Sequence, residues 1–415
     1  MLLEFSCSNH KSIREEIVFS ALAGKDTAHE EKLNTFGTLK VLKSAIIYGA
    51  NGSGKSNFVS AVEFMKKLVM DSINHQPGQG IAQKPHKLSG YEADSKFSIQ
   101  FVTDNVRYAY GFVLNKMLVT EEYLYYFPNN RQVKIFERQN DLFTTGSKFK
   151  GRLSNCKNVL KSNRLLLSCA ANFSSVSEIE KAFRFFVDDL VIYSTNNQPD
   201  WMHYSCQQIN TIPRMKNTVL AFMRSLGIGI KDIVVTINKK ALQESEIPPF
   251  LSDEFKKNLL ESTIDEIRAK LVYDDFETDL IKEESTGIQK LFAFLCPLID
   301  IIINGKVLIC DELEANLHES IIYNLVKLFV DLETNSFPQI FFTTHDTSIL
   351  SLDLFRRDQI WFTELSKEGR STNLYSLAEI KNVRKDENVG KGYISGRYGA
   401  IPMLNIDFAN IVSEM

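Results

Sequence analysis

The stretch Gly49-Ala50-Asn51-Gly52-Ser53-Gly54-Lys55-Ser56 decides how this 415-residue sequence is interpreted. Its spacing matches the pattern Gly-x-x-x-x-Gly-Lys-Ser, whose backbone N–H groups hold phosphates. An apolar run from Val41 to Tyr48 precedes it and predicts a buried strand. Apolar residues between Phe58 and Val69 recur at helical spacing and predict a helix. The stretch therefore has the strand, loop and helix order that a phosphate-binding loop requires.

Each residue type in such a loop has a task. Glycines let backbone amides approach the phosphates, the lysine neutralises phosphate charge, and the serine hydroxyl binds Mg²⁺. We therefore predict Lys55 as catalytic and Ser56 as a magnesium ligand. The predicted nucleotide-binding residues are Gly49, Asn51, Gly52, Gly54, Lys55, Ser56 and Asn57.

The amino-acid composition limits the class of protein to which this chain can belong. With 44% hydrophobic and 24% charged residues the chain is typical of globular proteins, and a net charge of -3 does not favour a protein that coats nucleic acid through charge alone. The six cysteines form no C-x-x-C pair, which predicts reduced core thiols. The longest apolar run, Leu291 to Ile303, is interrupted by Pro297 and Asp300. We therefore expect a soluble cytoplasmic protein without a membrane partner.

The pattern along the chain predicts one α/β domain divided by an insertion. Four strand-like segments separated by turn signals predict an antiparallel meander at 98–103, 108–114, 119–127 and 133–136. Alternation returns later, with a helix at 286–303, a strand at 307–310, a helix at 318–332 and a strand at 339–344. The predicted divisions are 1–145 and 276–375 for the ATPase domain, 146–275 for a mainly helical insertion and 376–415 for a tail.

Two further motifs supply chemistry. The apolar strand Val307 to Cys310 ends in Asp311 and Glu312, which predicts a magnesium contact from Asp311 and a water-activating catalytic base in Glu312. His345 follows the next strand, where a histidine can reach the γ-phosphate or orient the attacking water. We predict His345 as a third catalytic residue.

The polar turn Glu284-Ser285-Thr286-Gly287 opens the helix that leads into the Asp-Glu strand. At these residues the chain resembles the ABC-type ATPases, in the branch that includes RecF, the SMC proteins and the overcoming-lysogenization-defect ATPases. In that family a Ser-x-Gly signature contacts the γ-phosphate held by the opposite protomer. Ser285 and Gly287 match it, whereas Thr286 and Ile288 stand where glycine and Gln or Glu are usual.

The resemblance implies an α/β fold, an ABC-type P-loop ATPase domain with a mixed sheet, the meander and a helical insertion. It implies ATP and Mg²⁺ as cofactors and assembly as a dimer or higher ring. The segment Glu314 to Leu317 corresponds to a loop that crosses the dimer interface. The glutamine that senses magnesium has two candidates, Gln83 and Gln100.

The chain is most similar to the compact AAA/ABC-like ATPases of bacterial abortive-infection and anti-phage operons, among them the ATPase of PARIS-type systems. Two stretches carry this similarity: Arg107 to Phe112 in the meander, and Gly392 to Pro402 near the C-terminus. The residues of the second stretch do not by themselves indicate whether it packs or takes part in catalysis.

The insertion lacks sustained heptads, so a long coiled coil is not expected. About 70 residues follow His345, too few for a Toprim nuclease domain beside the closing strands, so a nuclease or other toxin is expected on a separate polypeptide. Residues 142–177 contain no acidic residue, which predicts a patch for nucleic acid or a partner. Its members are Lys148, Lys150, Arg152, Lys157, Lys161 and Arg164.

Three functional hypotheses follow. The first is an ATPase that senses or regulates in an anti-phage system, controls a separate effector, and in addition contacts DNA or a phage protein. The second is a RecF-like DNA-repair ATPase that clamps DNA. The third is a scaffold that binds nucleotide and assembles with little hydrolysis.

Overall fold

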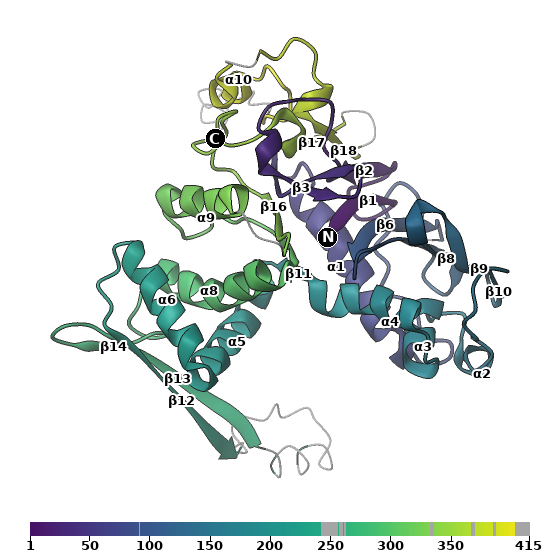
Figure 1. Cartoon of the computed structure of the whole chain (residues 1–415), viewed down its shortest axis with the longest axis horizontal. Coiled ribbons are helices and arrows are strands. Elements are labelled where there is room, and N and C mark those ends of the chain that lie inside the picture. The colour runs from purple at the N-terminus through teal and green to yellow at the C-terminus, as the bar shows by residue number, and fades with distance from the viewer. Residues whose placement is uncertain are drawn as a thin grey trace, which may run out of the picture. The chain divides into compact units, whose positions relative to one another are not determined.

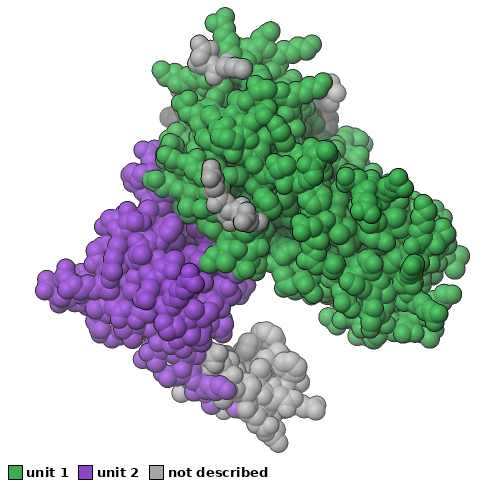
Figure 2. Space-filling view, viewed as in Figure 1, with its two compact units in different colours: residues 1–193, 301–314, 322–415 green, residues 194–300, 315–321 purple. Residues whose placement is uncertain are grey.

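The computed structural model divides the chain into two compact units, which are described separately (Figure 2). Unit 1 comprises residues 1–193, 301–314 and 322–415, and unit 2 comprises residues 194–300 and 315–321. The structure describes residues 1–90, 92–241, 256, 260, 263–332, 336–366, 370–384 and 387–402. The end of the predicted tail, 403–415, lies outside the described residues.

A six-stranded sheet forms the centre of unit 1, in the order β11-β15-β16-β5-β17-β18. All neighbours pair in parallel except β17 and β18, which form an antiparallel hairpin. The strands are β5 (Ser44–Gly49), β11 (Leu190–Tyr193), β15 (Val307–Cys310), β16 (Gln339–Thr343), β17 (Ile360–Leu365) and β18 (Thr372–Ser376). The buried side chains on β5, β15 and β16 explain their apolar sequences, because strands inside a parallel sheet are covered on both faces.

A seven-stranded antiparallel sheet lies in the same unit, in the order β10-β9-β8-β7-β6-β1-β2. Its strands are β1 (Leu2–Ser8), β2 (Ile17–Ser20), β6 (Ser95–Thr103), β7 (Val106–Leu114), β8 (Val119–Tyr126), β9 (Val133–Gln139) and β10 (Leu142–Thr145). The predicted meander is confirmed, and the N-terminal strands extend it on one side. A separate pair of short strands, β3 (Leu33–Phe36) and β4 (Leu39–Leu42), precedes β5.

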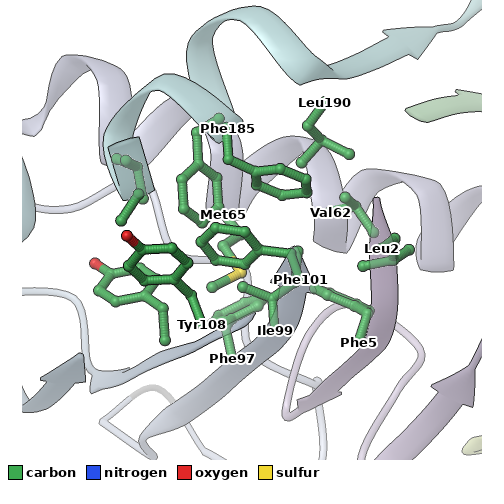
Figure 3. Packing of buried hydrophobic residues seen from close by; sticks show 14 of the residues in the cluster. Leu2, Phe5, Val62, Met65, Phe97, Ile99, Phe101, Tyr108, Phe185 and Leu190 are labelled. Atoms are coloured by element: carbon green, nitrogen blue, oxygen red, sulfur yellow. The ribbon is translucent and has the colours of Figure 1, made fainter. Parts of the chain in front are cut away.

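Helix α1 (Lys55–Asp71) follows the phosphate-binding loop and supplies a central part of the hydrophobic core. Figure 3 shows Val62 and Met65 of α1 beside Leu2 and Phe5 of β1, and beside Phe101 of β6. The remaining helices of this core are α2 (Cys156–Val159), α3 (Leu166–Phe173), α4 (Ser177–Arg184) and the π-helical turn Phe185–Asp189. Phe185 stacks on Phe101 with ring centroids 4.0 Å apart.

Unit 2 combines helices with a long antiparallel hairpin. Its elements are α5 (Gln198–Thr211), α6 (Pro213–Ser225), β12 (Asp232–Ala241), β13 (Thr263–Val272), β14 (Glu277–Asp279) and most of α8 (Thr286–Asn304). Trp201 of α5 stacks on Phe294 of α8 at a centroid distance of 5.3 Å. Helix α9 (Glu319–Asp331) begins in unit 2 and continues into unit 1.

The structure divides the chain differently from the sequence prediction. Residues 146–193 belong to unit 1, because their apolar side chains join its core and β11 is the edge strand of its parallel sheet. The insertion is less helical than predicted, since β12 and β13 pair over ten residues each. The signature turn also lies in unit 2 rather than with the parallel sheet. These boundaries depend on which layer each segment packs against. The periodicity of apolar residues shows that a segment is buried but not which layer covers it.

Helix α8 meets the length and hydropathy criteria of a membrane span, the one helix among the described residues that does. Residues Leu291 to Cys296 are at most 1% exposed and pack within the protein. The core helix of a soluble protein meets the same criteria, and the buried face of α8 fits that interpretation. All six cysteines are buried free thiols, as predicted from their spacing.

Gln339 joins β16 of the parallel sheet to strands β1 and β4 of the two other sheets in unit 1. Its side-chain carbonyl accepts the Leu2 N–H at 2.6 Å, and its amide donates to the carbonyl oxygens of Leu2 and Leu42 at 3.1 and 2.9 Å. Gln339 is fully buried, so these backbone groups have no access to water as an alternative partner. One amide side chain therefore satisfies three backbone groups on β1 and β4.

We expect Gln339→Leu to lower the free energy of unfolding by about 3 kcal/mol, because it leaves buried backbone groups without partners. Chemical denaturation of the purified protein measures this change. Gln132→Leu is the control, because Gln132 is exposed and the same substitution there leaves no buried backbone group without a partner. Equal stability of the two variants would show that Gln339 does not link the sheets.

Candidate functional site

The phosphate-binding loop runs from the end of β5 to the start of α1 in unit 1. Gly54 precedes α1 with φ +112°, a conformation that side-chain-bearing residues rarely adopt. A Cβ atom at Gly54 would also lie 2.1 Å from the Thr372 hydroxyl, and one at Gly49 would lie 2.3 Å from the Thr363 hydroxyl. Gly49 and Gly54 are therefore required by close contact with the β17–β18 hairpin.

A chain of hydrogen bonds fixes the loop from one side. The Asn57 side-chain amide donates to the Ser12 hydroxyl at 2.6 Å, and the Ser12 and Thr372 hydroxyls are 2.7 Å apart. Thr372 donates in turn to the Ser53 carbonyl oxygen at 2.8 Å. These directions are mutually consistent if Ser12 donates to Thr372. The Asn57 side chain, predicted to bind nucleotide, thus supports the loop through Ser12.

Lys55 lies inside the loop and is 5% exposed. Its ammonium group donates to the carbonyl oxygens of Gly49 and Ala50 at 2.7 and 3.2 Å. Burial lowers the pKa of Lys55, while the carboxylates of Glu314, Asp311 and Glu312 act in the opposite direction. The structure therefore brings the predicted lysine together with the predicted carboxylates. Ser56, at the next position, is exposed.

Thr343 positions the Asp-Glu pair. Its hydroxyl donates to Asp311 Oδ1 at 2.7 Å and accepts the Glu312 N–H at 2.8 Å. Glu312 has φ +51°, the left-handed region that residues other than glycine seldom occupy. Such backbone conformations are held by surrounding contacts and gather at functional sites. The threonine from β16 thus orients one carboxylate directly and holds the backbone of the other.

Glu314 belongs to the same cluster, a role that the sequence did not indicate. Its Oε1 accepts the His345 N–H at 2.5 Å. Its Oε2 is buried and has no hydrogen-bond partner among the described residues. The histidine itself is exposed. Glu314 was predicted only as the start of an interface loop, and only its spatial proximity to Lys55 reveals an additional carboxylate at the site.

A cavity of about 730 Å³ reaches the loop at Gly52. The described residues that line it include five basic side chains and no acidic one. These five are Lys11, Lys84, Lys87, Lys116 and Arg370. Burial and the neighbouring charge of Lys84 lower the pKa of Lys11, and Glu63 and Asp311 oppose this shift. No sequence motif indicates this cavity, because its cations come from segments far apart in the chain.

His86 links two segments that line this basic cavity, the loop around His86 and the β17–β18 hairpin. Its Nδ1 accepts the Leu88 N–H at 3.1 Å, so Nε2 carries the proton that is donated to the Arg370 carbonyl oxygen at 3.3 Å. The His86 N–H donates to Asn9 Oδ1 at 2.9 Å. The loop around His86, the N-terminal turn and the β17–β18 hairpin are therefore tied into one structure.

The signature residues lie at the start of α8 in unit 2. The Ser285 hydroxyl accepts the Ile288 N–H at 3.3 Å, so it caps the helix, and Ser285 is exposed. A Cβ atom at Gly287 would lie 2.6 Å from the Asn316 carbonyl oxygen in the same unit. Glycine at this position therefore allows close packing of the segment 315–321 against α8.

Five members of the predicted basic patch are exposed, namely Lys148, Lys150, Arg152, Lys157 and Lys161. Arg164 does not belong with them. Its guanidinium donates to the His75 carbonyl oxygen at 2.9 and 2.7 Å and to the Val159 carbonyl oxygen at 3.0 Å. These bonds hold a loop in place, so the structure assigns Arg164 to folding rather than to the surface patch.

The two candidate glutamines differ in position. Gln100 lies on β6, where it bonds Glu4 and Arg107, away from the loop. Gln83 lines the basic cavity, but its side-chain amide donates to the Ala93 carbonyl oxygen and the Ser95 hydroxyl. Both glutamines are held by contacts within the antiparallel part of unit 1. The side-chain oxygen of Gln83 is buried and has no hydrogen-bond partner among the described residues, so Gln83 remains the candidate of the two.

A protein-family model described as "AAA domain, putative AbiEii toxin, Type IV TA system" matches residues 44–155 and 233–351. The match covers more than half of the chain and includes the phosphate-binding loop, the signature turn, the Asp-Glu pair and His345. The chain belongs to this family. Membership of this family and the parallel sheet beside the phosphate-binding loop give an α/β AAA domain.

Solved structures similar to the chain include heads of SMC proteins. The head bound to the C-winged helix domain of ScpA has 13% identity and a TM-score of 0.45, with 90% of this chain and 97% of that chain covered. The head domain from Thermotoga maritima has 11% identity and a TM-score of 0.40, with 90% and 98% covered. A Pyrococcus furiosus head has 10% identity and a TM-score of 0.40, with 90% and 96% covered. A search of curated proteins gave no match.

We expect Thr343→Val to raise the Mg²⁺ concentration needed for half-maximal nucleotide binding by about tenfold, because Asp311 loses the hydroxyl that orients it. Titration of Mg²⁺ against a fluorescent nucleotide analogue measures the effect. The neighbouring Thr344→Val is the control, since Thr344 is equally buried but accepts the Asp346 N–H. A magnesium requirement unchanged by Thr343→Val contradicts the assigned role.

Proposed function

We propose that this protein binds Mg·ATP at the phosphate-binding loop and hydrolyses it at a site completed by a second copy of the chain. The observation that carries the proposal is the cluster of Lys55 with Asp311, Glu312 and Glu314 at the carboxyl ends of neighbouring strands. The hydroxyl of Ser56 and the carboxylate of Asp311 are the hard oxygen ligands that Mg²⁺ prefers. The residues present therefore fit a magnesium nucleotide.

Each side chain has a distinct task in this proposal. Lys55 exchanges its bonds to the loop carbonyls for phosphate oxygens and neutralises their charge. Glu312 accepts a proton from the attacking water, and Thr343 keeps its backbone in the required conformation. Bound Mg²⁺ would neutralise phosphate charge in the transition state. Glu314 holds the His345 backbone, so the histidine is presented beside the carboxylates.

The basic cavity next to Gly52 supports the same proposal. A nucleotide whose phosphates lie on the loop has its sugar and base beyond it, and the cavity supplies space of about 730 Å³ there. Its cations raise the local potential for an approaching polyanion. Lys11 is within electrostatic reach of Asp311, so it connects the cavity with the carboxylate cluster.

In this proposal the second copy contributes its signature residues to the site. Ser285 and Gly287 have the residue types of an ABC signature, and the exposed N-terminus of α8 carries a partial positive charge suited to a γ-phosphate. We propose that this surface meets the loop of a partner chain in a dimer or larger ring. Assembly would then be part of the catalytic cycle.

In biological terms, we propose a sensor or regulator in an anti-phage system of the abortive-infection type, including PARIS-like systems. The family description, which refers to a toxin–antitoxin system, supports this context. A separate toxic effector, such as a Toprim-type nuclease, would be held or released according to nucleotide state, and DNA or a phage protein would supply the trigger. Co-purification of the product of a neighbouring reading frame tests this part of the proposal.

A RecF-like DNA clamp is the second candidate, favoured by the five exposed cations between Lys148 and Lys161. Such a clamp binds DNA more tightly with ATP and acts without a toxic partner. A nucleotide-binding scaffold with little hydrolysis is the third. Comparison of phosphate release by wild type and Glu312→Gln distinguishes the scaffold from an ATPase.

We expect Glu312→Gln to reduce the ATPase rate by at least about 100-fold while leaving nucleotide binding intact, because the amide does not accept a proton from water. Phosphate release and equilibrium binding measure the two quantities. Glu319→Gln is the control, because Glu319 is an exposed residue of the first turn of α9. If wild type and Glu312→Gln release phosphate at equal rates, the protein is a scaffold rather than an ATPase.

Mixing two inactive variants tests whether the site is composite. Lys55→Ala removes the loop lysine, and Ser285→Arg blocks the signature. A dimer containing one of each retains one site with both halves intact, so a 1:1 mixture should recover about a quarter of the wild-type rate. If each site were built within one chain, the mixture would stay inactive.

A further inference from the structure

The segment Gly392 to Pro402 has no place in the ATPase chemistry described so far, and it lies outside the residues matched by the family model. It begins within helix α10 (Val389–Ile394). Its glycines are explained by close packing. A Cβ atom at Gly392 would lie 2.5 Å from the Tyr398 hydroxyl, and one at Gly399 would lie 2.8 Å from the Tyr375 hydroxyl. The segment is therefore folded tightly onto unit 1.

Tyr393 is the residue of this segment that covers the strand entering the phosphate-binding loop. Its ring lies 5.4 Å from the ring of Tyr48 and stacks on Phe362 at 5.6 Å. Tyr48 and Phe362 are paired neighbours on β5 and β17. Tyr393 is 8% exposed, so it closes the sheet immediately before the first loop glycine. Figure 1 shows α10 beyond the strands β17 and β18.

The Tyr393 hydroxyl connects the loop with the end of the segment. It donates to the Ala400 carbonyl oxygen at 3.2 Å, and the nearby Gly49 backbone lowers the pKa of this hydroxyl, which opposes the effect of burial. Ala400 has φ +58°, so this turn requires support from its surroundings. One side chain thereby packs on the strand that enters the phosphate-binding loop and bonds a strained turn of the C-terminal segment.

Residues beyond this turn lie against the loop. A cavity of about 660 Å³ is lined on one side by Ala50, Asn51, Gly52 and Ser53, and on another by Ala400, Ile401 and Pro402. Thr363, Glu364, Leu365, Ser366 and Asn373 complete the lining. The loop and the C-terminal segment therefore face the same cavity.

We propose that Tyr393 is a positioning residue of the nucleotide site, which holds Gly49 and the phosphate-binding loop in the conformation that accepts phosphates. The hydroxyl acts on the nucleotide only through the loop backbone. Without the Tyr393 hydroxyl, the loop samples other conformations, and the nucleotide binds only the fraction of molecules whose loop accepts phosphates. The effect on binding and turnover rests on the proposed ATP hydrolysis, whereas the effect on the loop does not.

The variant Tyr393→Phe removes the hydroxyl and keeps the ring that packs on Tyr48 and Phe362. The matched control is Tyr398→Phe. Tyr398 also stacks on Phe362, at 5.9 Å, but its hydroxyl donates to Glu387, a residue that does not line the loop. Both variants lose one buried hydroxyl from the same segment. A purely structural contribution should therefore affect both to a similar degree.

We expect Tyr393→Phe to raise the KM for ATP by about three- to tenfold, as expected for one lost hydrogen bond, with kcat changed less than about twofold. Tyr398→Phe should leave KM unchanged. Thermal unfolding without nucleotide should be similar for the two variants. A KM for Tyr393→Phe equal to that of wild type, or equal to that of Tyr398→Phe, overturns the proposal.

Hydrogen exchange of the full-length protein without nucleotide tests the loop independently of catalysis. Amides of residues 49–55 should exchange faster in Tyr393→Phe than in wild type or Tyr398→Phe. If wild type neither binds nor hydrolyses ATP, the proposed function fails while this measurement still decides the role of Tyr393. If hydrolysis is normal and exchange is unchanged by Tyr393→Phe, the positioning role fails and the proposed function stands.

Discussion

The contact between the phosphate-binding loop and the β17–β18 hairpin is the constraint on which the site depends. Thr363 and Thr372 approach the loop backbone so closely that only glycine fits at positions 49 and 54. The same threonines bond Ser53, through its hydroxyl and its carbonyl oxygen. The loop is held by groups from the far end of the chain, so its conformation depends on the β17–β18 hairpin lying beside β5.

Charge is distributed unevenly around that loop. Asp311, Glu312 and Glu314 lie on the side of β15 and β16, where they oppose the effect of burial on the pKa of Lys55. The basic cavity lined by Lys11 and Lys84 meets the loop at Gly52. A magnesium nucleotide carries both a cation and phosphates, so it is complementary to an arrangement of this kind. In such a ligand the Mg²⁺ is the partner of the carboxylates, and the phosphates are the partner of the basic side chains.

Sequence patterns predicted the central elements with small errors. The strand Val307–Cys310 has the predicted bounds, and the helix predicted at 286–303 extends from Thr286 to Asn304. Long periodic segments are predictable because burial imposes the period directly. The boundaries of the insertion were wrong, because Leu190–Tyr193 is too short a segment to indicate by itself that it completes the parallel sheet.

By itself, the sequence predicted which groups would carry the chemistry: the loop lysine, the Asp-Glu pair and the histidine after the next strand. These are local patterns, in which neighbouring residues suffice to define the motif. Only the tertiary structure decided the roles of Thr343, Glu314 and Tyr393, and it moved Arg164 from the surface patch to the fold. Their partners are distant in the chain, and a hydrogen bond between distant residues leaves no periodic signal in one sequence.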